Sequence, residues 1–418
     1  MQENEPVKQK RIEYNLEALR GGAALIVVLY HIIFFDQYLD PNYFPVVIKV
    51  LQFPGHLSVL VFFVLSGFVI GISNQQSLTI KTILPYLKKR FIRLYPIYFL
   101  SLVFTLLVAP VNYSLYTIGS NFTLTQGVVA PVIWENCPIW SLHYEALYYL
   151  IFIPVSLFRM KLIFVFFASL ILGLANYFFY PYLNTPIITS YAFGFIFWIA
   201  GLFISKYFTE KEAVTNYKLL VSNLFLFISL VYYNVFASIF NRIVLVLFKH
   251  NIAFSENINW AKKIILFSDL SYLPYCVLSV LLFSNRQFKY KKIIVICMQI
   301  LPAYTLFFIF KSIQVINVAE IIVSTICYII SLFLFFIKAE YLSFLSKKII
   351  HCGIWLGSIS YGIYIIHFPI LVIFKQIFVF SGSLFSFLVR LGAFLFLTVV
   401  SSFMLEKRFQ PWIKKLIG

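Results

Sequence analysis

Stretches of about 20 apolar residues recur along this whole chain, and they constrain its fold more than any other feature. A helix needs about 20 such residues to cross a hydrocarbon core about 30 Å thick. Charged residues make up only 11% of the 418 residues, whereas soluble domains carry about 25%. That is too little charge to cover a surface exposed to water. The sequence therefore predicts an all-α, polytopic membrane domain and excludes a soluble multidomain protein, a fibrous repeat and a disordered chain.

Twelve segments are long and apolar enough to span a membrane, and we expect ten to twelve transmembrane helices. The stretch 235–270 is interrupted by Arg242, Lys249 and His250, so a re-entrant or interfacial helix is the alternative there. The twelve segments are residues 17–36, 54–73, 92–111, 139–158, 162–180, 187–206, 218–240, 264–284, 293–311, 318–338, 354–380 and 384–404.

Lysine and arginine are concentrated on one side of these segments. There are 33 of them against 15 acidic residues, a formal charge of +18, and the positive-inside rule assigns their loops to the cytoplasm. The largest loop on the other side, residues 111–137, contains neither. We therefore expect a cytoplasmic segment 1–16, a membrane domain 17–404 and a basic cytoplasmic tail 405–418. Nucleic acid is not an expected partner, because the basic clusters lie between apolar spans rather than on one domain.

The five cysteines show no spacing typical of a metal site or a redox motif. Four of the five lie within or beside apolar stretches, so we interpret them as buried thiols and expect no metal. Residues 1–17 carry both signs of charge and lack the pattern of a cleaved signal peptide. The cysteines are Cys137, Cys276, Cys297, Cys327 and Cys352.

Arg20 and His31 lie in the first apolar segment, eleven residues apart. This separation is about three helical turns and about 16 Å of rise, so both side chains leave from one face of a helix. A guanidinium at the cytoplasmic end suits a phosphate-bearing ligand, and an imidazole deeper on that face suits proton transfer. Taken alone, Arg20 is better interpreted as an arginine that extends to the membrane surface, and His31 as a buried histidine whose hydrogen bonds are all formed within the protein. For the pair on one face we favour a function.

A second basic cluster, Lys88–Arg93, opens the third segment. Arg90 and Arg93 are neighbours on a helix at i, i+3. Anchoring at the cytoplasmic surface is sufficient to explain the lysines. Arg93, however, lies far enough into the span to need a partner, and an anionic ligand is the partner we expect.

Glu145 lies about two turns, or about 8 Å, into the fourth segment, which Trp140 and Ser141 open from the opposite side. That depth matches His31 approached from the other surface. A carboxylate beside an imidazole orients it and strengthens it as a base, so we expect Glu145 to pair with His31. A carboxylate held by some other hydrogen bond between helices is the alternative.

Tyr361, Tyr364 and His367 form one row on the eleventh segment, each three residues after the last. A polar stripe on an apolar helix is typical of a lined cavity, although tyrosines bonded to neighbouring helices would give the same pattern. In the second segment, Ser66 and Gly67 predict a close approach between helices.

Six sequence segments, in this order, resemble the membrane acyltransferase-3 family, the polytopic O-acyltransferases of bacterial surface polysaccharides. They extend over nearly the whole chain, and the six taken together are specific for this family. The segments are Leu-Arg-Gly-Gly-Ala-Ala with Tyr-His (19–31), Phe-Phe-Val-Leu-Ser-Gly-Phe (62–68), Arg-Phe-Ile-Arg-Leu-Tyr-Pro (90–96), Trp-Ser-Leu-His-Tyr-Glu (140–145), Ser-Tyr-Gly-Ile-Tyr-Ile-Ile-His-Phe-Pro (360–369) and Leu-Glu-Lys-Arg-Phe (405–409).

The resemblance implies a multi-pass protein of the bacterial inner membrane that moves an acyl group, commonly acetyl, from cytoplasmic acyl-CoA to a hydroxyl of a cell-surface or lipid-linked glycan. Arg20, Arg90 and Arg93 would bind the CoA phosphates. His31, oriented by Glu145, would be the general base or the acyl carrier. We expect no C-terminal SGNH-type hydrolase domain, so the membrane domain or a separate protein completes the transfer. The expected acceptor side is lined by Trp140, Ser141, Tyr361 and His367.

A proton-coupled transporter or flippase of a glycan precursor is the alternative class, because buried histidine, glutamate and arginine also suit such a carrier. The sequence shows no two-fold internal repeat, which counts against it. A glycan polymerase is a third class, but it would favour large outer loops containing arginine, and the largest loop contains none.

Overall fold

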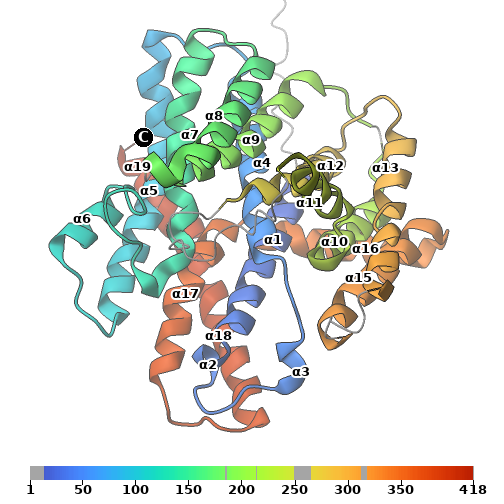
Figure 1. Cartoon of the computed structure of the whole chain (residues 1–418). Coiled ribbons are helices and arrows are strands. Elements are labelled where there is room, and N and C mark those ends of the chain that lie inside the picture. The colour runs from blue at the N-terminus through green and yellow to red at the C-terminus, as the bar shows by residue number, and fades with distance from the viewer. Residues whose placement is uncertain (1–13, 184–185, 213, 249–264, 312–317, 418) are drawn as a thin grey trace, which may run out of the picture.

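The computed structural model describes residues 14–183, 186–212, 214–248, 265–311 and 318–417. Within these ranges the regular elements are helices, and two isolated β-bridges are the only strand-like pairings. This confirms the predicted all-α membrane fold (Figure 1).

The helices up to the middle of the chain are α1 (Tyr14–Phe34), α2 (Asp36–Leu39), α3 (Val46–Lys49), α4 (Gly55–Ser73), α5 (Ile80–Val108), α6 (Leu115–Phe122), η1 (Trp134–Ile139), α7 (Trp140–Leu157), α8 (Leu162–Leu183) and α9 (Pro186–Tyr207). Those that follow are α10 (Tyr217–Tyr233), α11 (Val235–Phe248), η3 (Phe267–Tyr272), α12 (Leu273–Phe283), α13 (Lys291–Ile300), α14 (Ala303–Lys311), α15 (Val318–Phe336), α16 (Glu340–Gly357), α17 (Ser360–Gln376), α18 (Leu384–Phe403), η4 (Met404–Phe409) and α19 (Gln410–Ile417).

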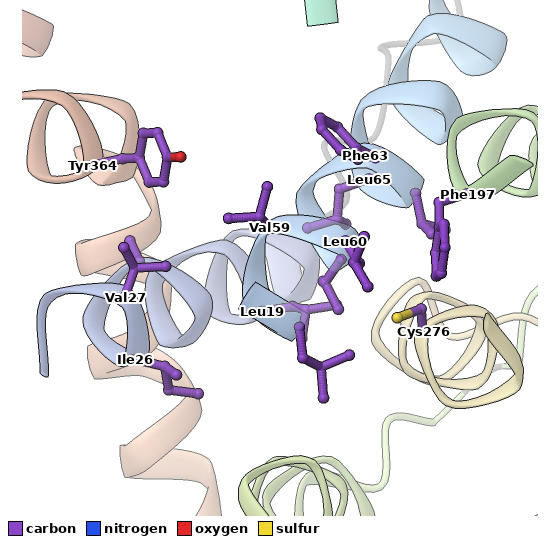
Figure 2. Packing of buried hydrophobic residues seen from close by; sticks show 14 of the residues in the cluster. Leu19, Ile26, Val27, Val59, Leu60, Phe63, Leu65, Phe197, Cys276 and Tyr364 are labelled. Carbon is purple, nitrogen blue, oxygen red and sulfur yellow. The ribbon is translucent and has the colours of Figure 1, made fainter. Parts of the chain in front are cut away.

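Helix α1 lies at the centre of the molecule and packs against α4, α16 and α17 (Figure 1). The core around it is formed by aliphatic and aromatic side chains from elements far apart in the sequence. Figure 2 shows Leu19 of α1, Leu60 of α4 and Cys276 of α12 in this cluster. The site described below is therefore held by helices from both halves of the chain.

Helix α4 crosses α9 at close range, and glycine makes this possible on both sides. A Cβ atom on Gly67 would overlap the carbonyl oxygen of Trp198, and one on Gly201 would overlap that of Val64. Small residues let helix backbones approach in membranes. The close approach predicted from Ser66 and Gly67 is confirmed.

Seven described helices are long and apolar enough to span a membrane, or up to eight if the bent pair α16–α17 counts as one span. This is fewer than the ten to twelve expected. The expected span 293–311 is divided into α13 and α14 around Pro302, and 264–284 consists of η3 and an α12 of only 11 residues. The expected span 354–380 bends by 70° between α16 and α17. In the ambiguous stretch 235–270, residues 249–264 lie outside the described residues.

The segment expected as a basic tail is helical and continues from α18. A π-helical turn, η4, joins α18 to α19. Gln410 donates hydrogen bonds to the carbonyl oxygens of Ile92 at 3.2 Å and Arg93 at 2.8 Å, which holds this segment against α5. A π-turn shifts the side chains that follow it around the helix axis, and here it accompanies a buried carboxylate, Glu406.

Candidate active site

Three arginines line a cavity of about 130 Å³ between α1, α4, α5, α7 and α17, which we call the arginine cavity. Arg20 enters it from α1, and Arg90 and Arg93 enter it from α5. The structure thus brings together the three residues expected to bind a phosphate-bearing donor. Its other polar lining residues are Ser66, Ser141, Glu145, Tyr149, Ser360, Tyr361 and Tyr364.

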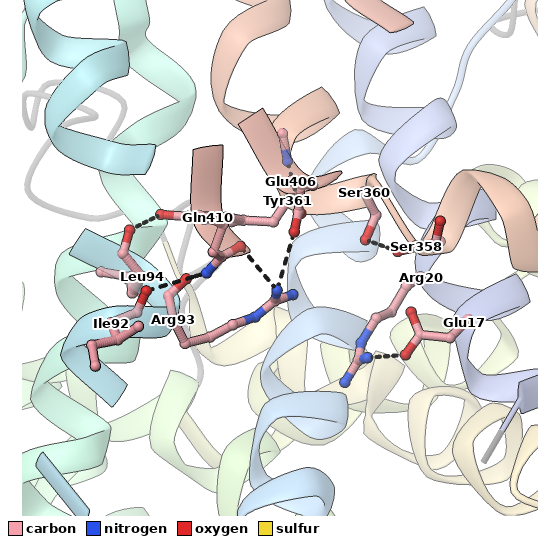
Figure 3. A network of polar contacts seen from close by, with 12 residues as sticks. Glu17, Arg20, Ile92, Arg93, Leu94, Ser358, Ser360, Tyr361, Glu406 and Gln410 are labelled. Atoms are coloured by element: carbon pink, nitrogen blue, oxygen red, sulfur yellow. Dashed lines mark hydrogen bonds and ion pairs between the residues drawn. The ribbon is translucent and has the colours of Figure 1, made fainter. Parts of the chain in front are cut away.

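Two of the three arginines already have carboxylate partners in the protein (Figure 3). Arg20 forms a close ion pair with Glu17 one turn earlier on α1. Arg93 Nη1 lies 3.1 Å from Glu406 Oε2. Arg93 thus has a partner, as its depth in the span predicted, and this partner is a carboxylate of the C-terminal segment.

Arg90 differs from the other two. Its buried Nε atom has no hydrogen-bond partner, and no ion pair to it is found within the described residues. The guanidinium lies over two aromatic rings, 5.8 Å from the ring centre of Tyr86 and 5.9 Å from that of Tyr149. A buried donor without a partner is costly, so the cavity fits an anionic or carbonyl-bearing ligand best at Arg90.

Glu145 lies in the arginine cavity and does not contact His31. Ser66 Oγ donates to Glu145 Oε1 at 2.8 Å, and the Tyr149 hydroxyl donates to the same oxygen. The predicted pairing of Glu145 with His31 is therefore wrong, and the alternative of a carboxylate held between helices describes it correctly. Trp140 shares the histidine cavity described below with His31, but Glu145, five residues and about 7.5 Å further along α7, reaches the arginine cavity, so the predicted match in depth is wrong.

His31 lines a second cavity of about 410 Å³, which we call the histidine cavity. Val59 and Tyr364 line both cavities and so form the boundary between them; Figure 2 shows the two side chains on α4 and α17. The Tyr364 hydroxyl is fixed at this boundary by the carbonyl oxygen of Pro138 at 2.6 Å and by Ser141 Oγ at 2.8 Å. The remaining lining is largely aromatic: Tyr30, Phe34, Phe35, Trp134 and Trp140.

The partner of His31 is His367, which is fully buried. His367 Nδ1 lies 3.0 Å from the carbonyl oxygen of Ile363 and must donate to it, so in a neutral ring Nε2 has no proton. His31 Nδ1, 3.1 Å away, then donates to that Nε2. This leaves the lone pair of His31 on Nε2, the atom that a base or a nucleophile uses.

Trp134 is held at the histidine cavity by the loop that precedes it. Tyr113 accepts a hydrogen bond from the Trp134 backbone N–H at 3.2 Å and donates one to Glu135. Burial, together with the bond to Glu135, raises the pKa of Tyr113 to about 12. The phenol therefore stays protonated at physiological pH and keeps this donor.

Three of the four residues expected on the acceptor side do not line the histidine cavity. Trp140 lines it. Ser141 and Tyr361 line the arginine cavity instead, and the Tyr361 hydroxyl donates to the carbonyl oxygen of Leu94 at 2.7 Å. His367 supports His31 from behind and is not among the lining residues of either cavity.

Two histidines with no expected role also lie at this site. His56 lines the histidine cavity and forms a 2.9 Å contact with Asp269. His143 is buried beside a third, mainly apolar cavity, and neither of its ring nitrogens has a hydrogen-bond partner within the described residues. Ionisable side chains inside apolar segments were the available signal for both. Among the described residues no group of three or more His, Cys, Asp and Glu is arranged to hold a metal ion.

Comparison with known proteins gives one match. A family model described as an acyltransferase domain, Acyl_transf_3, matches residues 13–273, which include Arg20, His31 and Glu145. No curated protein and no solved structure matches the chain. With more than half of its length matched and with the family's sequence segments gathered around two adjoining cavities, this chain belongs to the acyltransferase-3 family of membrane proteins.

Proposed function

We propose that this membrane acyltransferase moves an acetyl group from acetyl-CoA to a hydroxyl of a cell-surface or lipid-linked glycan. The observation that carries the proposal is the pair of cavities that meet at Val59 and Tyr364. One of them offers arginines to an anionic donor, and the other offers an imidazole with a free lone pair to a hydroxyl. A thioester that enters from the first and a hydroxyl that enters from the second would meet at this boundary.

The donor would approach from the arginine side, which the positive-inside rule assigns to the cytoplasm. A cavity of about 130 Å³ is smaller than the usual 300–1,000 Å³ of a site that encloses a whole ligand. The thin pantetheine arm with its thioester would therefore enter, while the nucleotide stays at the mouth. Arg90 has the most binding capacity to offer, because Arg20 and Arg93 are partly neutralised by Glu17 and Glu406.

The acceptor would occupy the histidine cavity. Indole and phenyl rings are suited to the apolar faces of a sugar, and a hydroxyl of that sugar would lie against His31 Nε2. His31 would then act either as general base on the hydroxyl or as the carrier of the acyl group. His367 would hold the His31 ring through the Nδ1 proton and share the charge that either route creates.

A single experiment tests the proposal. Membranes that contain the protein are incubated with acetyl-CoA labelled in the acetyl group, and label in glycan is counted. The wild-type protein should transfer label, and His31→Ala should abolish transfer while it still binds CoA. A carrier would transfer no label to glycan, and wild-type product from His31→Ala would remove His31 from the mechanism.

A further inference from the structure

His56 and Asp269 form a histidine–carboxylate pair at the histidine cavity, although 213 residues separate them. The His56 Nε2 atom lies 2.9 Å from Asp269 Oδ2, and the same oxygen accepts the Leu266 backbone N–H at 2.7 Å. The Asp269 side chain is only 10% exposed. The carboxylate is thus fixed in place before any substrate arrives.

This contact determines which atom of His56 faces a ligand. Because the carboxylate can only accept, Nε2 carries the proton and the lone pair of a neutral ring lies on Nδ1. Within the described residues no hydrogen bond to Nδ1 is found. The imidazole also stacks on Trp140, with ring centres 6.1 Å apart and planes 19° apart. A cavity wall therefore presents a free, oriented base beside an indole ring.

His56 and His31 lie at a similar depth. His56 precedes Val59 on α4 by three residues, and His367, the partner of His31, follows Tyr364 on α17 by three residues. A separation of three residues corresponds to about 4.5 Å of helix rise, so His56 and His367 each lie about that far from the boundary between the cavities. Both lie on the side away from the arginine cavity, which Ser66 on α4 and Ser360 on α17 line. His31 on α1 and His56 on α4 both line the histidine cavity, so a ligand bound there lies against both side chains.

The two imidazoles differ in what supports them. His31 is backed by a neutral ring, whereas His56 is backed by a carboxylate that stabilises a positive charge on it. A base oriented and stabilised by a carboxylate is the arrangement that accepts a proton from a hydroxyl in acyl transfer. We propose that His56, positioned by Asp269, is the base that deprotonates the acceptor hydroxyl, and that His31 carries the acyl group.

This inference rests on the proposed function and divides the reaction into two balanced steps. First, His31 Nε2 attacks the thioester carbonyl, the C–S bond breaks, and CoA leaves as the thiolate with the bonding electron pair. His31 is then an acyl-imidazolium whose Nδ1 proton is held by His367. Second, the acceptor hydroxyl gives its proton to His56 Nδ1 and its oxygen attacks the acyl carbon. The C–N bond breaks, its electron pair returns to His31, and the proton on His56 passes to water or to the thiolate.

The two steps can be measured separately on purified protein in lipid nanodiscs. Exchange of labelled CoA into acetyl-CoA in the absence of glycan reports the first step alone. Acetylation of glycan in membranes reports both. The test variants are His56→Gln, which keeps a donor to Asp269 but cannot take a proton, and Asp269→Asn, which keeps the hydrogen-bond acceptor but removes the charge. The matched control is His351→Gln, because His351 is exposed on α16 and lines neither cavity.

We expect His56→Gln to acetylate glycan at least about 100-fold more slowly and Asp269→Asn at least about tenfold more slowly, because a general base contributes about 10²–10⁴. Both variants should exchange CoA at the wild-type rate, whereas His31→Gln should lose both reactions. Near-normal acetylation of glycan by His56→Gln would overturn the inference. Loss of CoA exchange in His56→Gln would overturn it too. So would a wild-type protein that acetylates glycan but does not exchange CoA. Wild-type protein that does neither reaction would instead overturn the proposed function itself.

Discussion

Of the three arginines in the arginine cavity, Arg90 alone has no carboxylate partner in the part of the chain that the structure describes, and this makes it the sharpest test of donor binding. A hydrogen bond to a charged group contributes about 1.5–3 kcal/mol, so Arg90→Gln should raise the Kd for CoA about tenfold to 150-fold. Equilibrium binding of labelled CoA to purified protein measures this. Lys89→Gln removes the neighbouring charge from an exposed side chain outside the cavity and should leave Kd unchanged. Equal effects of both substitutions would mean that only general surface charge matters.

Arg93 is a poor residue to remove alone, because its loss strands Glu406. The Glu406 side chain is 4% exposed, and its two oxygens accept from Arg93 and from the backbone N–H of Gly362. A buried acceptor deprived of its partner costs about 1–3 kcal/mol, more when it is charged. Arg93→Gln should therefore lower the Tm in detergent, and adding Glu406→Gln should restore part of the loss. A double variant no more stable than Arg93→Gln would show that the stranded Glu406 carboxylate does not cause the loss.

At the scale of residues, the sequence predicted which side chains matter better than it predicted their partners. Arg20 and His31 were placed through helix periodicity, which holds within one helix. Glu145 was paired with the wrong residue because the depth of α7 relative to α1 depends on packing that no local pattern encodes. The contact between His56 and Asp269 was missed for the same reason, because the sequence around either residue does not indicate that the other lies beside it.

Between elements, the close crossing of α4 and α9 depends on two glycines. A methyl group on Gly67 would meet the Trp198 carbonyl group, which cannot move without displacing α9. Gly67→Ala should therefore lower the yield of folded protein and its Tm. Gly392→Ala is the matched control, because nothing lies within 4 Å of that position, and alanine in an open helical site should be neutral or stabilise by up to about 1 kcal/mol. A Gly67→Ala protein as stable as the control would contradict the close packing.

Three expected spans are not single straight helices, because apolar composition does not reveal where a helix breaks. Pro302 lacks a backbone N–H and separates α13 from α14. The bend of 70° between α16 and α17 follows Gly357, where a Cβ atom would overlap the Glu17 carbonyl group of α1. Both breaks were present in the sequence as proline and glycine, but their effect depends on which neighbouring helix is close.

Over the whole molecule, the site is assembled from both ends of the chain. The family match ends at residue 273. Three residues beyond it, Tyr364, His367 and Glu406, contribute to the site formed by the matched part. Tyr364 closes the boundary between the cavities, His367 orients His31, and Glu406 neutralises Arg93. The sequence indicated this only through the resemblance of segments 360–369 and 405–409, because contacts across more than 300 residues leave no periodic trace.

The boundary at Val59 and Tyr364 gives the final prediction, because a through-membrane transfer requires the two cavities to communicate there. Val59→Phe adds bulk at a position that lines both, so it should block acetyl transfer while the Kd for CoA stays within about twofold of wild type. Val59→Ala should widen the passage and raise the rate with butyryl-CoA relative to acetyl-CoA. Val389→Phe, on the exposed face of α18, controls for the added ring. Wild-type transfer by Val59→Phe would show that donor and acceptor meet elsewhere.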